Sequence, residues 1–370
     1  MVLVEKLLAL PFVCLGWLAL LLAAGPAAAA RPRPPYALPG PEAPVALLHA
    51  NRATYLVTQH SVLRLEGHRL VSCFHSAEPI QCAAARDTAL WLGLPQGLLH
   101  LGTRTFRPRP QALPGVAAPN ITVLFYDARG QLWAGANGAG VFRQAGPAFV
   151  QELRTPAING GVATLADSTV WIATSIGLSR QQHGEWTRYN EEGVANHEIP
   201  DNIVEKLLPD NDGNLWVVMS DAICVFEGGG RRAPAEAELP TVKFIGRPGN
   251  AVFGVAHVPG AGRLFATAMG LLLLPDAPAT PLPGFAAATD RIEPQRLLRP
   301  LPTLPGVGNP TLLAVDEQQR LWLAGPEGVA MLTGKEVRRW VQASTSPLPG
   351  TAPDPLSKKE GAPVLTKRNP

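Results

Sequence analysis

The chain has 370 residues, of which 46% are hydrophobic and only 16% are charged, and its formal net charge is +3 at pH 7. This balance excludes a strongly basic nucleic-acid-binding protein and an acidic disordered chain. Glycine and proline are frequent, at 36 and 38 residues, and their frequency predicts many short elements joined by turns.

The first segment, residues 1–30, has the order of a secretory signal peptide. Lys6 precedes an apolar run from Leu7 to Ala24, and the small residues Ala27 to Ala30 follow. We therefore predict cleavage near Ala30 and an exported chain, secreted or periplasmic, with no membrane segment after cleavage. An uncleaved anchor is the alternative, since the run is about long enough to span a membrane. A Pro-rich leader, 31–44, follows.

Three cysteines remain after residue 30, namely Cys73, Cys82 and Cys224. An odd number cannot pair completely within one chain. Cys73 and Cys82 could form a disulfide in an oxidising compartment, but buried free thiols in strands are the favoured interpretation. No Cys or His cluster has metal-ligand spacing, and the calcium-like start at Asp210–Gly213 lacks its closing Glu. We expect neither a metal nor a cofactor.

One short motif recurs seven times and organises the middle of the chain. Its aromatic anchors are Tyr55, Trp91, Trp133, Trp171, Trp216, Phe265 and Trp322. A small residue follows most anchors six positions later, as Gly97 follows Trp91, although Gly270 comes one residue early in the sixth copy. A turn rich in Asp and Gly precedes three anchors, as Asp127–Gly130 precedes Trp133.

The spacing of these anchors predicts the fold class. Successive anchors lie about 44 residues apart on average, the length of four short antiparallel strands. We predict an all-β protein, a seven-bladed β-propeller over 45–342, in which each aromatic ring fills the space between neighbouring blades. A disordered Pro-rich tail, 343–370, follows. Two forms of ring closure remain open: each blade comes from one continuous segment, or residues near Tyr36 complete the last blade.

The repeat is similar to the two-component regulator propeller repeat, Asp-x-x-Gly-x-Leu-Trp-x-Gly-Thr-x-x-Gly-Leu. Residues 127–141 and 210–225 match it best, and the resemblance covers about 300 residues. It implies an extracytoplasmic sensor-type propeller. In that family a β-sandwich, a membrane helix and a histidine kinase usually follow the propeller. Here only the tail follows, so we expect a stand-alone exported propeller without the kinase part, and the family offers no catalytic residue.

Propeller ligands usually lie over the central channel, where loops carry function and the blades serve as scaffold. The loops between the second and third strands of the blades would face that channel. The candidate ligand-binding residues in these loops are Gln59, His60, Gln96, Asn137, Ser175, Asp221 and Glu327.

Two functions fit this arrangement. The first is non-catalytic binding of an oligosaccharide, a peptide or another envelope protein, without nucleic acid. The alternative is an enzyme, a lyase or hydrolase at the channel mouth, because streptogramin-lyase-like propellers have similarly short blades. His60 and Glu327 would then be the acid–base pair, since blades 1 and 7 become neighbours when the ring closes. The oligomeric state stays open.

Overall fold

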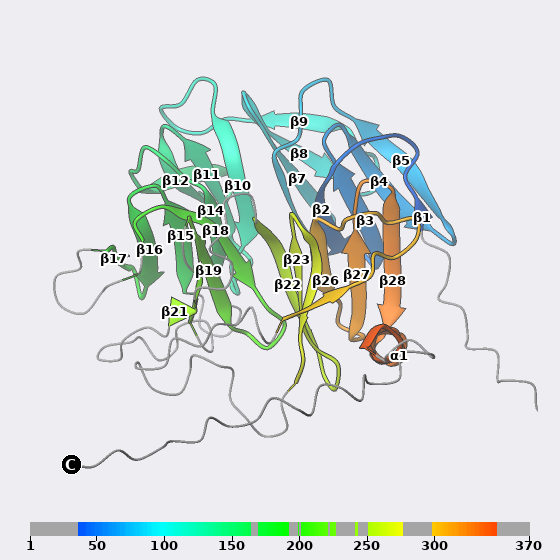
Figure 1. Ribbon diagram of the computed structural model, residues 1–370. Coiled ribbons are helices and arrows are strands. Elements are labelled where there is room, and N and C mark those ends of the chain that lie inside the picture. Colours follow the sequence, from blue (N-terminus) through cyan, green and yellow to red (C-terminus); the bar gives the residue numbers. More distant parts are fainter. Residues whose placement is uncertain are drawn as a thin grey trace, which may run out of the picture. The chain divides into compact units, whose positions relative to one another are not determined.

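The computed structural model describes residues 36–163, 169–191, 199, 201–220, 223–226, 241–242, 251–276 and 298–345. These residues form seven antiparallel sheets of four strands each (Figure 1). The predicted all-β class and the seven-bladed β-propeller are therefore confirmed. The predicted signal peptide and the segment after residue 345 lie outside the described residues.

Each of the first six blades takes its strands in chain order, from the inner to the outer strand. Blades 1 to 3 consist of β2 (Pro44–Ala50), β3 (Ala53–Thr58), β4 (Ser61–Glu66) and β5 (Arg69–His75); β6 (Cys82–Arg86), β7 (Ala89–Leu94), β8 (Gly97–Gly102) and β9 (Pro108–Gln111); and β10 (Asn120–Tyr126), β11 (Leu132–Asn137), β12 (Gly140–Ala145) and β13 (Ala148–Leu153). Blades 4 to 6 consist of β14 (Gly160–Ala163), β15 (Val170–Thr174), β16 (Gly177–Gln182) and β17 (Glu185–Tyr189); β18 (Val204–Pro209), β19 (Leu215–Met219), β20 (Ile223–Phe226) and β21 (Thr241–Val242); and β22 (Val252–Val258), β23 (Gly262–Thr267), β24 (Gly270–Leu274) and β25 (Arg299–Leu301).

The seventh blade is built from both ends of the propeller sequence. It contains β26 (Leu312–Val315), β27 (Arg320–Ala324) and β28 (Gly328–Thr333), and its fourth strand is β1 (Tyr36–Ala37). Tyr36 pairs with Val329 and Ala37 with Gly328, beside the orange β28 in Figure 1. Residues near Tyr36 thus complete the last blade, which decides between the two forms of closure. The β1 strand falls within the segment predicted as a Pro-rich leader.

Contacts between successive inner strands close the ring. Each inner strand contacts the next, and β26 contacts β2. Seven hydrophobic clusters accompany these contacts, one between each pair of neighbouring blades. Trp171, for example, lies between blades 4 and 5, with its ring centroid 5.0 Å from that of Phe226. The anchors recur because each interface needs a large apolar side chain to exclude water.

An aspartate explains why the Asp-rich turn precedes the tryptophan by a fixed distance. Asp127 accepts a 2.8 Å hydrogen bond from the backbone N–H of Gln131 and a 3.0 Å bond from the indole N–H of Trp133. Gly130 completes the turn at φ +79°, a region that glycine adopts without strain. One carboxylate therefore fixes both the turn and the ring that packs against the next blade.

The same aspartate–tryptophan pair recurs in two other blades. The indole N–H of Trp216 donates to Asp210 at 2.9 Å, and that of Trp322 donates to Asp316 at 2.8 Å. The carboxylate of Asp210 also accepts hydrogen bonds from the backbone and side chain of Asn214, so it stabilises its own turn.

The anchor assigned to the sixth copy is wrong by one residue. Thr267 pairs with Gly270, as Thr174 pairs with Gly177 in blade 4. Counting back three residues from Thr267 places Leu264, not Phe265, at the anchor position. Phe265 instead belongs to the cluster between blades 5 and 6, whereas Leu264 belongs to the one between blades 6 and 7. A shift of one residue turns a strand side chain to the other face of the sheet.

A helix that the sequence analysis did not predict follows β28. Helix α1 spans Gly334–Thr345, across the predicted boundary at residue 342. Thr333 and Glu336 form its capping box: the backbone N–H of Glu336 lies 3.3 Å from the Thr333 hydroxyl, and that of Thr333 donates to Glu336 at 2.7 Å. Val337 and Val341 pack into the cluster between blades 6 and 7. In the described part of the chain, no helix is long and apolar enough to cross a membrane.

Candidate functional site

The turns of the blades lie at two ends. We call "channel face" the end formed by the turns between the second and third strands and by the loops that enter the inner strands. The structure places six of the seven candidate residues in these turns: Gln59 and His60 between β3 and β4, Gln96 between β7 and β8, Asn137 at the end of β11, Ser175 between β15 and β16, and Glu327 between β27 and β28. Asp221 lies outside the described residues.

His60 is held by the turn in which it lies. Its backbone N–H donates to Glu42 at 3.1 Å, and the hydroxyls of Ser61, at 3.1 Å, and Thr58 bond to the same carboxylate. Burial disfavours the charged form of Glu42, but these hydrogen bonds outweigh it and hold its pKa below the usual value. The His60 Nδ1 atom lies 3.2 Å from the carbonyl oxygen of Ser76. These contacts stabilise the start of blade 1.

Glu327 lies on the other side of the ring closure and has a different neighbourhood. Its side chain is exposed, and its carbonyl oxygen accepts a 3.5 Å hydrogen bond from the backbone N–H of Leu38, just after β1. Among the described residues, no hydrogen bond or ion pair joins His60 to Glu327. The structure therefore places both residues on the channel face, but in the part of the chain that it describes it does not join their side chains by a hydrogen bond or an ion pair.

Several channel-face side chains connect neighbouring blades instead of facing solvent freely. Gln81 donates to Asn120 at 2.8 Å, which joins blades 2 and 3. Asn159 donates to the carbonyl oxygen of Val204 at 2.8 Å, between blades 4 and 5, and also lies 3.3 Å from the Ser175 hydroxyl. These residues were not predicted from the sequence. Their signal was a polar side chain just before or at the start of an inner strand.

Exposed apolar side chains are also found on the channel face. Ile176 lies in the turn between β15 and β16, Ile203 directly precedes β18, and Met269 lies in the turn between β23 and β24. Their exposed fractions are 43%, 46% and 69%. These residues belong to the consecutive blades 4, 5 and 6. Polar side chains border them, as Ser175 does in the same turn as Ile176.

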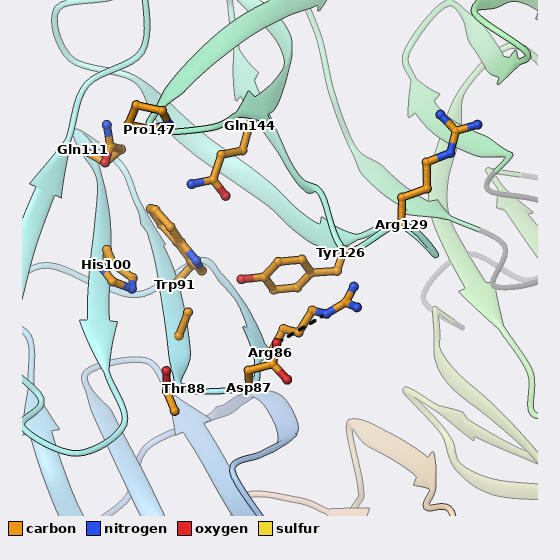
Figure 2. Close-up of a pocket in the computed structure, with 12 residues that line it drawn as sticks. Arg86, Asp87, Thr88, Trp91, His100, Gln111, Tyr126, Arg129, Gln144 and Pro147 are labelled. Atoms are coloured by element: carbon orange, nitrogen blue, oxygen red, sulfur yellow. Dashed lines mark ion pairs between the residues drawn. The ribbon is translucent and has the colours of Figure 1, made fainter.

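A pocket of about 630 Å³ lies elsewhere, between blades 2 and 3 (Figure 2). None of its lining residues comes from a channel-face turn. They come from strands β6 to β10 and β12 and from the β6–β7, β10–β11 and β12–β13 turns: Arg86, Asp87, Thr88, Ala89, Trp91, His100, Gln111, Tyr126, Arg129, Gly130, Gln144 and Pro147. Its volume is in the range of pockets that bind small molecules.

The cysteines and the possible metal ligands are also candidate functional groups. Cys73, Cys82 and Cys224 are not disulfide-bonded, so the interpretation as free thiols applies to them. Cys224 is buried, and burial raises the pKa of its thiol to about 12. No group of three or more His, Cys, Asp or Glu residues within the described ranges has a geometry that could hold a metal ion.

No protein-family model matches the chain, and no curated protein sequence matches it. Solved structures do. The extracellular domain of the hybrid two-component system BT4673 from B. thetaiotaomicron is similar with a TM-score of 0.59 and 16% identity, over 81% of this chain. This chain spans 39% of the length of that domain.

Two smaller propellers match over nearly their whole lengths. Streptogramin B lyase has a TM-score of 0.57 and 12% identity, over 81% of this chain and 96% of the lyase. YCF48 bound to D1 peptide has a TM-score of 0.55 and 12% identity, over 81% of this chain and 94% of that structure. At these identities the likeness shows a shared fold, which includes extracellular sensor domains, an enzyme and a peptide-binding protein.

Proposed function

We propose that this chain is an exported, non-catalytic propeller of the two-component regulator repeat type that binds a peptide segment of a partner protein on its channel face. The observation that carries the proposal is the exposure of Ile176, Ile203 and Met269 at the same end of three consecutive blades. Exposed apolar side chains bordered by polar ones are typical of protein-interaction surfaces.

The composition of the face favours a peptide over a small polar ligand. Removal of isoleucine and methionine side chains from water by a partner is favourable and stabilises the complex. Methionine also adapts its shape to the partner. The exposed Gln59 and Gln96 in the channel-face turns of blades 1 and 2 can donate hydrogen bonds to backbone carbonyl groups and accept them from N–H groups. Export rests on the predicted signal peptide, so the partner would be an envelope or extracellular protein.

The similar structures support binding without deciding it. YCF48 is described bound to a peptide, and the similar parts of BT4673 and BT3049 belong to extracellular domains of two-component systems. The lyase alternative requires an acid–base pair. His60 directs Nδ1 toward the Ser76 carbonyl oxygen and makes no hydrogen bond with Glu327, and for this reason we favour binding.

A peptide library displayed on phage tests this proposal. Residues 31–370 would be immobilised, and the enriched peptides would be measured against the wild type and the variant Ile176→Ser, Ile203→Ser and Met269→Ser. We expect the triple variant to lose at least tenfold in affinity. Val71→Ser with Val150→Ser is the matched control, because these exposed valines lie on the outer strands β5 and β13. Equal affinity of the two variants, or no enriched peptide, would contradict the proposal.

A further inference from the structure

Blade 2 departs from the aspartate–tryptophan pattern at one position. Ala84 pairs with Trp91 and Arg86 with Ala89, whereas in blade 3 Phe125 pairs with Trp133 and the backbone N–H of Asp127 bonds to Gln131. The turn of blade 2 is one residue shorter. Arg86 therefore occupies the place that Asp127 takes in blade 3, so a cation stands where the repeat has a carboxylate.

The tryptophan of blade 2 lacks the acceptor that the pattern supplies. Trp91 is 4% exposed, and within the described residues its indole N–H has no hydrogen-bond partner. Figure 2 shows the Tyr126 hydroxyl pointing toward this nitrogen. Burial has the larger effect on the pKa of the phenol and raises it, and Trp91 is close enough to lower it, but the geometry of the two groups does not make a hydrogen bond. A buried donor without a partner costs about 1–3 kcal/mol, so a site that keeps one is suited to receive an acceptor from outside.

The cross-strand partner of Trp91 also leaves room. In blades 3 and 4 this partner is an arginine whose guanidinium lies over the indole, Arg143 at 5.9 Å from Trp133 and Arg180 at 5.3 Å from Trp171. In blade 2 the partner is the shorter His100, whose ring centroid lies 4.6 Å from that of Trp91. The pocket opens between this pair and Tyr126.

The chain itself shows which group fits between an arginine and an indole N–H. In blade 7 the Asp316 carboxylate lies 2.6 Å from Arg320 Nε and 2.8 Å from Trp322 Nε1. In blade 5 the Asp210 carboxylate bonds to Trp216 and lies 3.7 Å from Arg263 Nε. Blade 2 has the arginine and the indole but no carboxylate between them.

We propose that the pocket between blades 2 and 3 binds the carboxylate of a small organic acid, which takes the place of the missing aspartate. The Trp91 N–H would donate to the carboxylate, and Arg86 would supply the opposite charge. Arg86 makes a 3.8 Å ion pair with Asp87, whose side chain is 88% exposed, and its guanidinium lies over the Tyr126 ring, 6.0 Å from the centroid. The cation therefore stands beside Tyr126, at the edge of the pocket. This site is independent of the proposed peptide site, because it shares no residue with the channel face.

The neighbouring groups suit an anionic guest. Burial raises the pKa of the Tyr126 phenol, so its hydroxyl stays protonated and can donate. Burial and the nearby Arg109 lower the pKa of His100, so the imidazole stays neutral at neutral pH. Gln111 and Gln144 line the pocket and can bond to the remainder of the acid.

Ligand-observed NMR with matched probe pairs tests the site on residues 31–370. The probes are benzoate, indole-3-acetate and glucuronate, each beside its uncharged amide. We expect at least one acid to bind at least tenfold more tightly than its amide. Arg86→Asp restores the carboxylate of the repeat within the chain, so it should abolish binding of that acid and raise the melting temperature. Arg52→Ala, which removes a charge from the exposed turn between β2 and β3, is the control and should bind normally.

Arg86→Gln serves as a second variant in case the aspartate disturbs folding, and it should weaken binding at least tenfold while the far-UV spectrum stays unchanged. The proposal is overturned if none of the three acids binds, if acids and amides bind equally, or if Arg52→Ala weakens binding as much as the Arg86 variants do. Failure of peptide capture on the channel face would leave these results unaffected, so the two proposals can fail separately.

Discussion

The indole N–H of Trp133 donates a 3.0 Å hydrogen bond to the carboxylate of Asp127, and both residues are nearly inaccessible to solvent. This pair connects the turn at one end of blade 3 to the apolar contact between blades 3 and 4. Asp127→Ala should lower the free energy of unfolding by about 2–3 kcal/mol, because it removes a hydrogen bond to a charged group and leaves a buried donor unpaired.

The matched control for this substitution is Asp87→Ala. Asp87 lies in the corresponding turn of blade 2, but it is exposed and makes only a 3.8 Å ion pair with Arg86. Urea unfolding should show that this variant lowers the free energy of unfolding by about 0.5 kcal/mol or less. Equal losses for the two alanine variants would mean that the hydrogen bond to Trp133 does not stabilise the blade.

Asp316 should make stability depend on pH in the acid range. Burial opposes its ionisation, but hydrogen bonds from Trp322 and Arg320 outweigh burial and hold its pKa below the usual 3.8. A carboxyl with a lowered folded-state pKa adds stability that is present above the unfolded-state pKa and is lost as the pH falls through the folded value. Unfolding free energies from pH 6 down to pH 2 should therefore fall more steeply for the wild type than for Asp316→Asn.

Glu317→Gln is the control for the acid titration, because Glu317 is exposed in the same turn. The unfolding free energy of this variant should fall as steeply between pH 6 and pH 2 as that of the wild type. Parallel curves for the wild type and Asp316→Asn would show that the folded state does not hold the Asp316 carboxylate in its charged form.

The closure of the ring depends on a glycine in β28. A side-chain carbon at Gly328 would lie 2.6 Å from the backbone oxygen of Tyr36 and 2.5 Å from that of Gly306. Gly328→Ala should therefore displace β1 and lower the melting temperature by several degrees. Gly97 occupies the same position of the repeat in blade 2, where a side-chain carbon meets nothing within 4 Å. Gly97→Ala should be tolerated, and equal effects would contradict this description of the closure.

Tyr36 tests the same closure from the other strand. Its side chain is 7% exposed and packs with Leu56 and Trp322 between blades 7 and 1. Tyr36→Ala should cost about 3 kcal/mol, the usual range for removing a buried aromatic ring. Hydrogen exchange should show the loss first in β28 and β2. A variant with wild-type protection in these strands would show that the ring is stable without β1.

The repeat could be read from the sequence because one physical requirement recurs in every blade. A large side chain must fill each interface, and Trp171 and Trp216 meet this requirement within motifs of the same length. The sixth copy misled the assignment, because Phe265 is aromatic but faces the preceding blade and Leu264 takes the anchor position. The early Gly270 was the signal that the anchor should move by one residue.

Features that depend on pairing between strands far apart in the sequence could not be predicted from the sequence. The two forms of ring closure differ in whether Tyr36 pairs with Val329, which lies near the other end of the propeller sequence. The pocket at Trp91 likewise depends on Tyr126 of the next blade. In the sequence, this pocket is indicated only by the missing aspartate before Trp91. Because the turn of blade 2 is shorter, the strand pairing is needed to show that Arg86 takes the place of that aspartate.

Thiol reactivity checks the packing of blade 5. Burial raises the pKa of Cys224 to about 12, and the side chain is fully buried, so the thiolate that reacts with a disulfide reagent is scarce. In residues 31–370, native protein should react with this reagent at the half-buried Cys73 at least tenfold faster than at Cys224. Cys73→Ser combined with Cys82→Ser leaves Cys224 as the only thiol and should remove the fast phase. A fast phase that remains in this double variant would show that blade 5 opens readily.

Binding without catalysis on the channel face can be tested with one peptide selected on the wild type. The peptide is added in a thermal-unfolding experiment and is then recovered for mass spectrometry. A ligand that binds only the folded state, at a hundredfold excess over its Kd, adds about 2.7 kcal/mol of stability. We expect the peptide to raise the Tm of the wild type but not that of the Ile176, Ile203 and Met269 variant, and to be recovered with unchanged mass. A peptide recovered cleaved or otherwise altered by the wild type would contradict the claim and make the propeller an enzyme.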